Sequence, residues 1–270
     1  MLKDITIGQY VPGDSAVHRL DPRTKIIATG LLMMALFILE DKFGLFVLGV
    51  LLIGAQVASG LPLRMILRGL RPLLIILLIA VPLQLFLTPG QSLLYLGPFT
   101  ITDQGLRLAG LLIVRLIFLI ILTSLLTLTT SPIALTDGLE RLLTPLKRIR
   151  VPAHELAMMT TIALRFIPIF AEEAEKIIKA QKARGANFEG GGVVQRGKNL
   201  VAVLVPLLVS AFRRAEDLAL AMEARCYQGG EKRTRLYQPQ MTGLDYLVIA
   251  VSGLMCVYSI LTRVWPGILW

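Results

Sequence analysis

The sequence predicts an all-α, polytopic membrane protein with about five membrane-spanning helices and a separate region of three amphipathic helices. Three observations lead to this fold class. The chain is 55% hydrophobic over 270 residues, with a mean hydropathy of +0.70, which exceeds the apolar share of a soluble domain of this length. Five apolar runs approach the length of about 20 residues that a bilayer requires. Basic residues gather in a few segments between these runs.

The apolar runs predict the membrane helices in chain order, at about 26–39, 43–59, 73–87, 106–128 and 244–261. The first and third are short, so they are expected to use flanking turns or to lie beside thicker neighbours. Asp21 and Pro22 predict the start of the first helix, with aspartate as the cap and proline at the first helical position. In the second run, Gly54 with Ala58 and Ala55 with Ser59 have the four-residue spacing of small residues that permits close helix packing.

The basic residues predict the orientation of these spans. The net charge is +10, and 24 of the 28 lysines and arginines lie in three segments that should all be cytoplasmic. Residues 88–104 contain neither lysine nor arginine, so this link and the C-terminal residues 265–270 should lie outside. Placement in the cytoplasmic membrane explains the charge without a nucleic-acid partner. The cytoplasmic segments hold Lys3, Arg19, Arg23 and Lys25; Arg64, Arg68 and Arg71; and 17 residues between Arg141 and Arg235.

The predicted organisation is an N-terminal membrane region at 1–130, a cytoplasmic region at 131–241 and a C-terminal span at 242–270. The cytoplasmic region predicts three amphipathic helices, separated at 145–152 and 190–192. Pro168 and Pro206 lie within the second and third helices, where each removes a backbone donor and should bend its helix as a hinge. Acidic and basic residues are mixed on the polar faces, which favours contact with protein over contact with a lipid surface.

The two longer amphipathic helices show the helical spacing of three and four residues. Their apolar positions are Leu156, Met159, Ala163, Phe166, Phe170, Ala174 and Ile177 in the second helix, and Leu204, Leu207, Ala211, Leu218 and Met222 in the third. Their opposite faces carry Glu172, Glu173, Glu175, Lys176 and Lys179, and Arg213, Arg214, Glu216 and Asp217. These stripes must be buried on each other, on the membrane spans or on the bilayer surface.

Each of these two helices is predicted to end in an arginine between two small residues. A basic residue in the last turn favours the helix macrodipole by about 0.3–1 kcal/mol, and glycine ends a helix. Alternatively, the small neighbours leave each guanidinium unobstructed, so that it can enter a groove of a partner and bind carboxylates or carbonyls. Two like ends in one region suit two like partners. The triplets are Ala183, Arg184 and Gly185, and Ala224, Arg225 and Cys226.

Three segments of the chain resemble those of a known family. They are HRLDPRTKI at 18–26, RFIPIFAEEAEKIIKAQKARG at 165–185 and EARCY at 223–227. Their content and order are similar to those of the transmembrane T component of energy-coupling factor transporters. In these vitamin and metal-ion importers, a T subunit joins two ABC-type ATPases to a separate substrate-binding S subunit. The resemblance covers nearly the whole chain, and it departs from the family at Cys226, where glycine is frequent.

The resemblance implies a non-catalytic coupling subunit that carries no cofactor. Arg184 and Arg225 would each dock into a groove of one ATPase subunit, and the amphipathic helices would be coupling helices. The implied partners are two ABC-type ATPases, a membrane-embedded S component and the lipid bilayer. The resemblance leaves the cargo open, because selectivity belongs to the S component in this family.

Other functions find less support in the sequence. The chain contains no GxxxxGK[ST] phosphate loop, HExxH, CxxC or Ser-His-Asp grouping, so an enzyme is not expected. The remaining alternative is a self-sufficient secondary carrier or channel, which would require a midplane site built from broken helices or internal repeats.

The sequence also permits predictions for one arginine, two histidines and two cysteines. Arg115 lies inside the fourth span, where it is expected to bind a backbone carbonyl or a polar neighbour such as Gln84. An ion pathway at Arg115 is the other interpretation. His18 and His154 have no cysteine or second histidine nearby, and Cys226 and Cys256 lack the spacing of metal ligands, so no metal site is predicted.

Overall fold

The computed structural model describes residues 10–96, 99–145, 152–186, 188, 190, 192–229 and 240–264. The chain divides into two compact units. Of the described residues, 10–138 and 240–264 form the first, called here the membrane unit, and those from 139 to 229 form the second, called the amphipathic unit. The predicted placement of residues 265–270 outside the membrane falls beyond the described residues.

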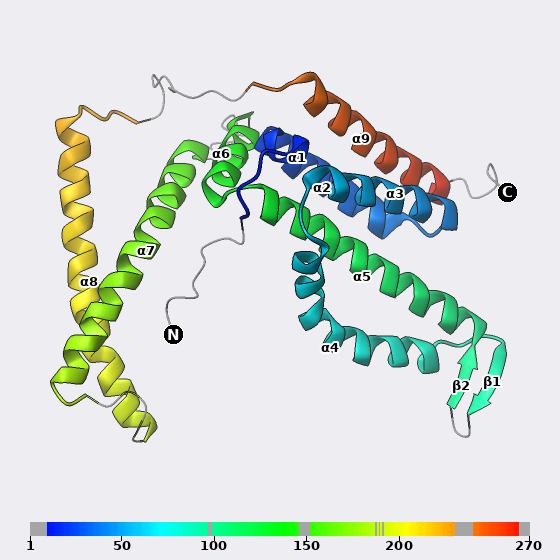
Figure 1. Ribbon diagram of the computed structural model, residues 1–270, viewed down its shortest axis with the longest axis horizontal. Helices are drawn as coiled ribbons and strands as arrows, with labels where there is room; N and C mark the ends of the chain where they lie inside the picture. Colours follow the sequence, from blue (N-terminus) through cyan, green and yellow to red (C-terminus); the bar gives the residue numbers. More distant parts are fainter. Residues whose placement is uncertain are drawn as a thin grey trace. The chain divides into compact units, whose positions relative to one another are not determined.

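Each of the five predicted apolar runs lies in a helix of the membrane unit (Figure 1). Helices α2 and α9 pack on each other, and α5 contacts α2, α3 and α4. A core of Leu36, Leu39, Leu48, Leu52, Leu122 and Met255 forms where α2, α3, α5 and α9 meet. The elements of this unit are α1 (Ala16–Arg19), α2 (Pro22–Ile38), α3 (Lys42–Ser59), α4 (Leu63–Leu87), β1 (Ser92–Leu96), β2 (Phe99–Thr102), α5 (Asp103–Thr129) and α9 (Gly243–Val264).

The start of α2 confirms the predicted cap. The Asp21 side chain accepts a hydrogen bond from the backbone N–H of Arg23 at 2.9 Å, and Pro22 is the first helical residue. Of the two pairs of small residues in α3, Gly54 and Ala58 are exposed within this chain, whereas Ser59 of the other pair is buried. The buried stripe of α3 includes Leu48 and Leu52, and α3 packs against α5 at Gly49, where a Cβ atom would lie 2.9 Å from the Phe118 ring.

Polar contacts hold the link between α2 and α3. Arg115 of α5 donates from Nη2 to the carbonyl of Leu39 at 2.8 Å, which confirms the predicted backbone partner. Tyr258 of α9 donates to Asp41 Oδ2 at 3.0 Å, and Asp41 also accepts from the backbone N–H of Gly44 at 2.6 Å. The α2–α3 link is therefore bound to both α5 and α9.

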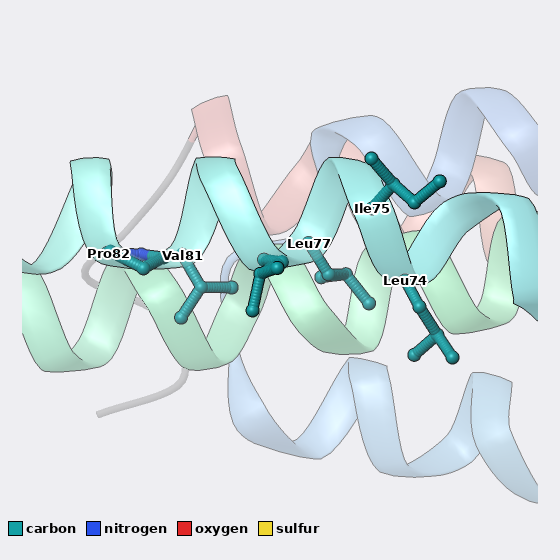
Figure 2. A pocket seen from close by; sticks show the side chains of 6 residues that line it. Leu74, Ile75, Leu77, Val81 and Pro82 are labelled. Carbon is teal, nitrogen blue, oxygen red and sulfur yellow. The ribbon is translucent and has the colours of Figure 1, made fainter.

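Helix α4 begins ten residues before its apolar run and bends before it continues along α5 (Figure 1). Its outward surface has an open pocket with aliphatic walls, and Figure 2 shows Leu74, Leu77 and Val81 pointing to the same side of the helix. Such a surface suits contact with hydrocarbon. The pocket is lined by Leu74, Ile75, Leu77, Leu78, Val81 and Pro82.

Strands β1 and β2 form an antiparallel hairpin between α4 and α5. The register pairs Leu94 with Ile101 and Leu96 with Phe99, and an irregularity lies between Ser92 and Leu94. This hairpin was not predicted from the sequence. It leaves the fold class unchanged, because the protein is otherwise helical and suits an all-α polytopic membrane protein.

Four helices in the described part of the chain are long and apolar enough to cross a membrane, namely α3, α5, α7 and α9. The run Leu73–Leu87 of α4 is apolar but shorter. Helix α7 is the least apolar of the four. Its last third carries Glu172, Glu173, Glu175, Lys176 and Lys179. The location of α7 outside the membrane therefore stays a prediction.

The three predicted amphipathic helices are present as α6 (Pro132–Leu143), α7 (Ala153–Ala183) and α8 (Val193–Ala224). Helix α6 crosses the boundary between the units along the chain, and α7 and α8 belong to the amphipathic unit. At a rise of about 1.5 Å per residue, α7 and α8 are each roughly 45–50 Å long. Both helices continue through their internal prolines, Pro168 and Pro206.

Candidate functional site

Helix α7 ends in a tight turn around Arg184. Arg184 is the C-cap residue, with φ −84° and ψ 7°, and Gly185 after it has φ +90°. The backbone N–H of Gly185 donates to Lys182 O at 3.0 Å, and that of Ala186 donates to Gln181 O at 3.0 Å. This pair of bonds is the Schellman motif, which needs a left-handed residue after the cap and therefore favours glycine.

Helix α8 ends in the same turn around Arg225. Arg225 is the C-cap residue, with φ −91° and ψ 13°, and the backbone N–H groups of Cys226 and Tyr227 donate to Glu223 O and Met222 O at 2.8 and 3.1 Å. Cys226 has a φ of 53°, in the left-handed region where a Cβ atom is unfavourable. The cysteine therefore occupies the position that glycine occupies at the end of α7.

The two triplets share their exposure as well as their backbone. Both arginines and their small neighbours are exposed. The left-handed residue stops each helix directly after its arginine, so the guanidinium stands at the negative end of the helix dipole with no bulky side chain beside it in the triplet. The macrodipole and the groove-docking interpretations of the sequence are both compatible with this geometry.

Helices α7 and α8 run antiparallel. Glu173 of α7 accepts hydrogen bonds from Ser210 and, at 3.1 Å, from Arg214 of α8. Further along α7, Gln181 donates to the carbonyl of Ala202 at 3.4 Å, so the contact moves backward along α8. Because both arginines are at C-termini, this direction puts Arg184 and Arg225 at opposite ends of the pair (Figure 1).

The polar contact between α7 and α8 differs from the sequence prediction. Glu173 and Arg214 were expected on outward polar faces, yet they pair with each other, with side chains 23% and 41% exposed. The crossing of the two helices brings them together, and spacing within one helix cannot reveal a crossing. Helix α7 leaves much of the apolar surface of α8 uncovered. The side chains of Leu200, Val201, Leu204, Val205, Leu208, Val209 and Phe212 are 47–65% exposed.

A lysine from the HRLDPRTKI segment is buried in the membrane unit. Lys25 is 7% exposed, and its Nζ donates to the carbonyls of Thr129 at 2.8 Å and His18 at 3.2 Å. From the sequence, this residue was expected only to contribute to the cytoplasmic charge. Its contacts instead connect the start of α2 to the end of α5, one residue before the chain turns toward α6.

Two buried carboxylates lie near this lysine and interact with its charge, those of Asp245 and Asp21. Asp245 is fully buried and accepts from the backbone N–H of Asp21 at 2.9 Å and from that of Thr242 at 2.7 Å. The role of Asp245 was not predicted from the sequence. Its signal is the spacing of Thr242 and Asp245, because threonine followed three residues later by an acid is typical of a capped helix start.

The two histidines bind protein groups. His18 contacts Ser15 Oγ at 2.6 Å and the Val11 carbonyl at 3.1 Å, and His154 lies between Glu140 and Tyr227. Among the described residues, no three histidine, cysteine, aspartate or glutamate side chains gather as metal ligands would. The sequence analysis did not predict the contacts of His154.

Known proteins match this chain over most of its length. The family described as "CbiQ: Cobalt transport protein" matches residues 13–236. Relatives named "Energy-coupling factor transporter transmembrane protein EcfT" include that of Heliobacterium modesticaldum, 58% identical over 96% of this chain and 99% of its own, and that of Thermosediminibacter oceani, 55% identical over 97% and 99%. The Bacillus subtilis relative is 46% identical over 92% and 94%. The chain therefore belongs to this family, the transmembrane components of energy-coupling factor transporters.

Proposed function

We propose that this multi-pass membrane protein is the coupling subunit of its transporter complex. It connects two ABC-type ATPase subunits to a separate, membrane-embedded S component that binds the cargo, a vitamin or a metal ion. The chain itself performs no catalytic step in this proposal, because ATP is bound and hydrolysed by the partners.

The observation that carries the proposal is the pair of matching helix ends. Arg184 and Arg225 have nearly the same backbone conformation, the same capping bonds and the same exposure, and they lie at opposite ends of one antiparallel pair. One basic C-cap is explained by the macrodipole alone. Two equal ends, separated by the length of the pair, suit two similar subunits that each present a groove of carboxylates or carbonyls.

The uncovered apolar surface supports contact with the S component. Residues Leu200 to Phe212 of α8 hold the exposed aliphatic and aromatic side chains described above, and a soluble helix rarely exposes so many. In our proposal the S component packs on this surface. When ATP draws the ATPases together, the docked arginines move with them and change the angle between α7 and α8, with Pro168 and Pro206 as hinges. Ligand-driven coupling of this kind requires different affinities in the two states.

The charge distribution supports the orientation that we propose. The proposed location is the cytoplasmic membrane, with the N-terminus and residues 131–241 in the cytoplasm, where the ATPases lie. The name of the relatives supports membership of an energy-coupling factor complex.

Charge reversal tests the docking. The chain is co-expressed with candidate ATPase subunits, purified through a tag on the chain, and assayed for retained ATPase. Arg184→Glu and Arg225→Glu should each weaken retention, and the double variant should abolish it. The matched control is Arg213→Glu, an exposed arginine in the middle of α8 that lies outside both capping motifs.

Full retention by the double variant would contradict the docking role. Reconstitution provides a second measurement, because a self-sufficient carrier or channel would transport cargo in vesicles without any ATPase. The proposal predicts no transport by the chain alone.

A further inference from the structure

The ring of His154 bridges three segments of the amphipathic unit. His154 is the second residue of α7, Glu140 belongs to α6, and Tyr227 follows α8. The ring Nδ1 lies 2.9 Å from Glu140 Oε1, and Nε2 lies 3.4 Å from the Tyr227 hydroxyl oxygen. These contacts join residues that are 14 and 73 positions apart in the sequence.

One tautomer of the ring satisfies both contacts. In the neutral ring with a proton on Nδ1, this nitrogen donates to the Glu140 carboxylate and Nε2 accepts from the Tyr227 hydroxyl. In the protonated ring, Nε2 donates to the hydroxyl oxygen instead, so the connection persists in both states. The carboxylate is the better shielded partner, since the Glu140 side chain is 11% exposed and the His154 side chain 27%. The contacts of His154 with Glu140 and Tyr227 therefore hold the three segments together in either protonation state of the ring.

The link ends beside one of the two docking arginines. Tyr227 is two residues after Arg225, and its backbone N–H donates to Met222 O at 3.1 Å within the capping motif. The motif thus fixes the Tyr227 backbone relative to the Arg225 backbone. At the other end, Gln181 precedes Arg184 by three residues and contacts Ala202 of α8. The end of α7 at Arg184 is therefore connected to α8, and we call it the Arg184 end. The end of α8 at Arg225, called the Arg225 end, is connected to α7 and α6.

We propose that Tyr227, His154 and Glu140 are positioning residues that hold the Arg225 end against α6, so that the two docking ends transmit motion by different routes. The proposal rests on the docking function proposed above. Motion of the Arg225 end would reach α6 through the side chains of Tyr227, His154 and Glu140. Because α6 directly follows α5 along the chain, the motion would then reach the α5–α6 connection. Motion of the Arg184 end reaches first the α7–α8 contact.

A distance measurement between spin labels tests this link. The labels replace Leu139 on α6 and Gln228 beside Tyr227, both exposed, in a chain carrying Cys226→Gly and Cys256→Ser. The distance is recorded for the chain with its ATPases, with and without ATP, and for the isolated chain. We expect one narrow distribution that ATP leaves unchanged, whereas a label pair at Leu139 and Lys179 should change its distance on ATP binding.

Tyr227→Phe removes only the hydroxyl group that binds the ring. Loss of one hydrogen bond should raise the fraction of molecules in which Tyr227 has left His154 about two- to tenfold. The distribution of distances between the labels at positions 139 and 228 should then become broader. His154→Phe should broaden it at least as much, and the double variant should add nothing to His154→Phe, because both residues act through one chain of contacts. The control is Tyr246→Phe, on a 63% exposed tyrosine of α9, which should leave the distribution narrow.

A 139–228 distribution that stays narrow in Tyr227→Phe would overturn the proposal, as would additive broadening in the double variant. Tyr227→Phe carries the test alone if His154→Phe does not fold. The isolated chain separates this inference from the docking function. Broadening there supports the link even if charge reversal at Arg184 and Arg225 leaves ATPase retention intact, which would refute docking alone.

Discussion

Replacement of Lys25 by methionine should strongly destabilise the membrane unit. The side chain is 7% exposed, its ammonium donates to the carbonyls of Thr129 and His18, and it lies near the carboxylates of Asp21 and Asp245. Methionine retains much of the apolar stem and removes the charge. Both carboxylates are almost wholly buried, at 4% and 0% exposure, and in this variant Asp21 would keep its contact with Arg23 and Asp245 its hydrogen bonds from the backbone of Asp21 and Thr242.

The cost follows from the lost hydrogen bonds. A hydrogen bond to a charged group typically contributes about 1.5–3 kcal/mol, and methionine would leave the two carbonyls without this donor. For a chain of this size, that loss corresponds to a fall of about 3–12 °C in the midpoint of thermal denaturation. The assay is denaturation of the purified protein in detergent. Arg64→Met is the matched control, because Arg64 is exposed and its replacement should change stability by less than about 0.5 kcal/mol.

The two variants should therefore differ in their midpoints of thermal denaturation. If Lys25→Met melts at the same temperature as Arg64→Met, the buried cation does not hold α2, α5 and α9 together. The account of Lys25 as a residue that connects the start of α2 to the end of α5 would then be wrong.

Three further predictions use the same denaturation assay. Cys226→Gly should stabilise the protein by about 0.5–1 kcal/mol, because the steric penalty of a left-handed residue with a Cβ atom, about 1–2 kcal/mol, exceeds the entropic cost of glycine; a lower midpoint in this variant would count against the φ of 53°. Tyr258→Phe should cost about 1–3 kcal/mol through loss of the bond to Asp41, with Tyr246→Phe as a control that changes little. Alanine variants of Glu173 and Arg214 should be non-additive by about 0.2–1 kcal/mol, the range of partly exposed ion pairs, and strict additivity would argue against their contact across α7 and α8.

The membrane helices could be predicted because apolar runs report burial in hydrocarbon directly. The ends of these helices were harder to predict from the sequence. Helix α4 extends back to Leu63 through a basic stretch, because a helix can continue past the apolar part of its sequence. The hairpin had a signal that went unused: a Gly97-Pro98 pair between two apolar runs is typical of a turn between strands. Only the charge of this segment entered the prediction.

Some features of the candidate site could likewise be predicted from the sequence, and others could not. Arg184 and Arg225 were found from local sequence, since small neighbours and a glycine describe a helix end. The left-handed conformation of Cys226 was not apparent, because cysteine gives no such signal. The pairing of Glu173 with Arg214, and of His154 with Glu140 and Tyr227, depends on how helices cross. A single sequence contains the periodicity of each helix and no measure of that crossing.

Site-specific photo-cross-linking at positions 183 and 226 shows whether the two helix ends contact the ATPase subunits. A photoreactive residue replaces Ala183 or Cys226, beside each arginine, in the chain co-expressed with its transporter subunits. The account predicts that each position cross-links to an ATPase subunit, and that Arg184→Glu or Arg225→Glu removes the product at its own end. Cross-links to lipid or to the S component, with none to an ATPase, would contradict it.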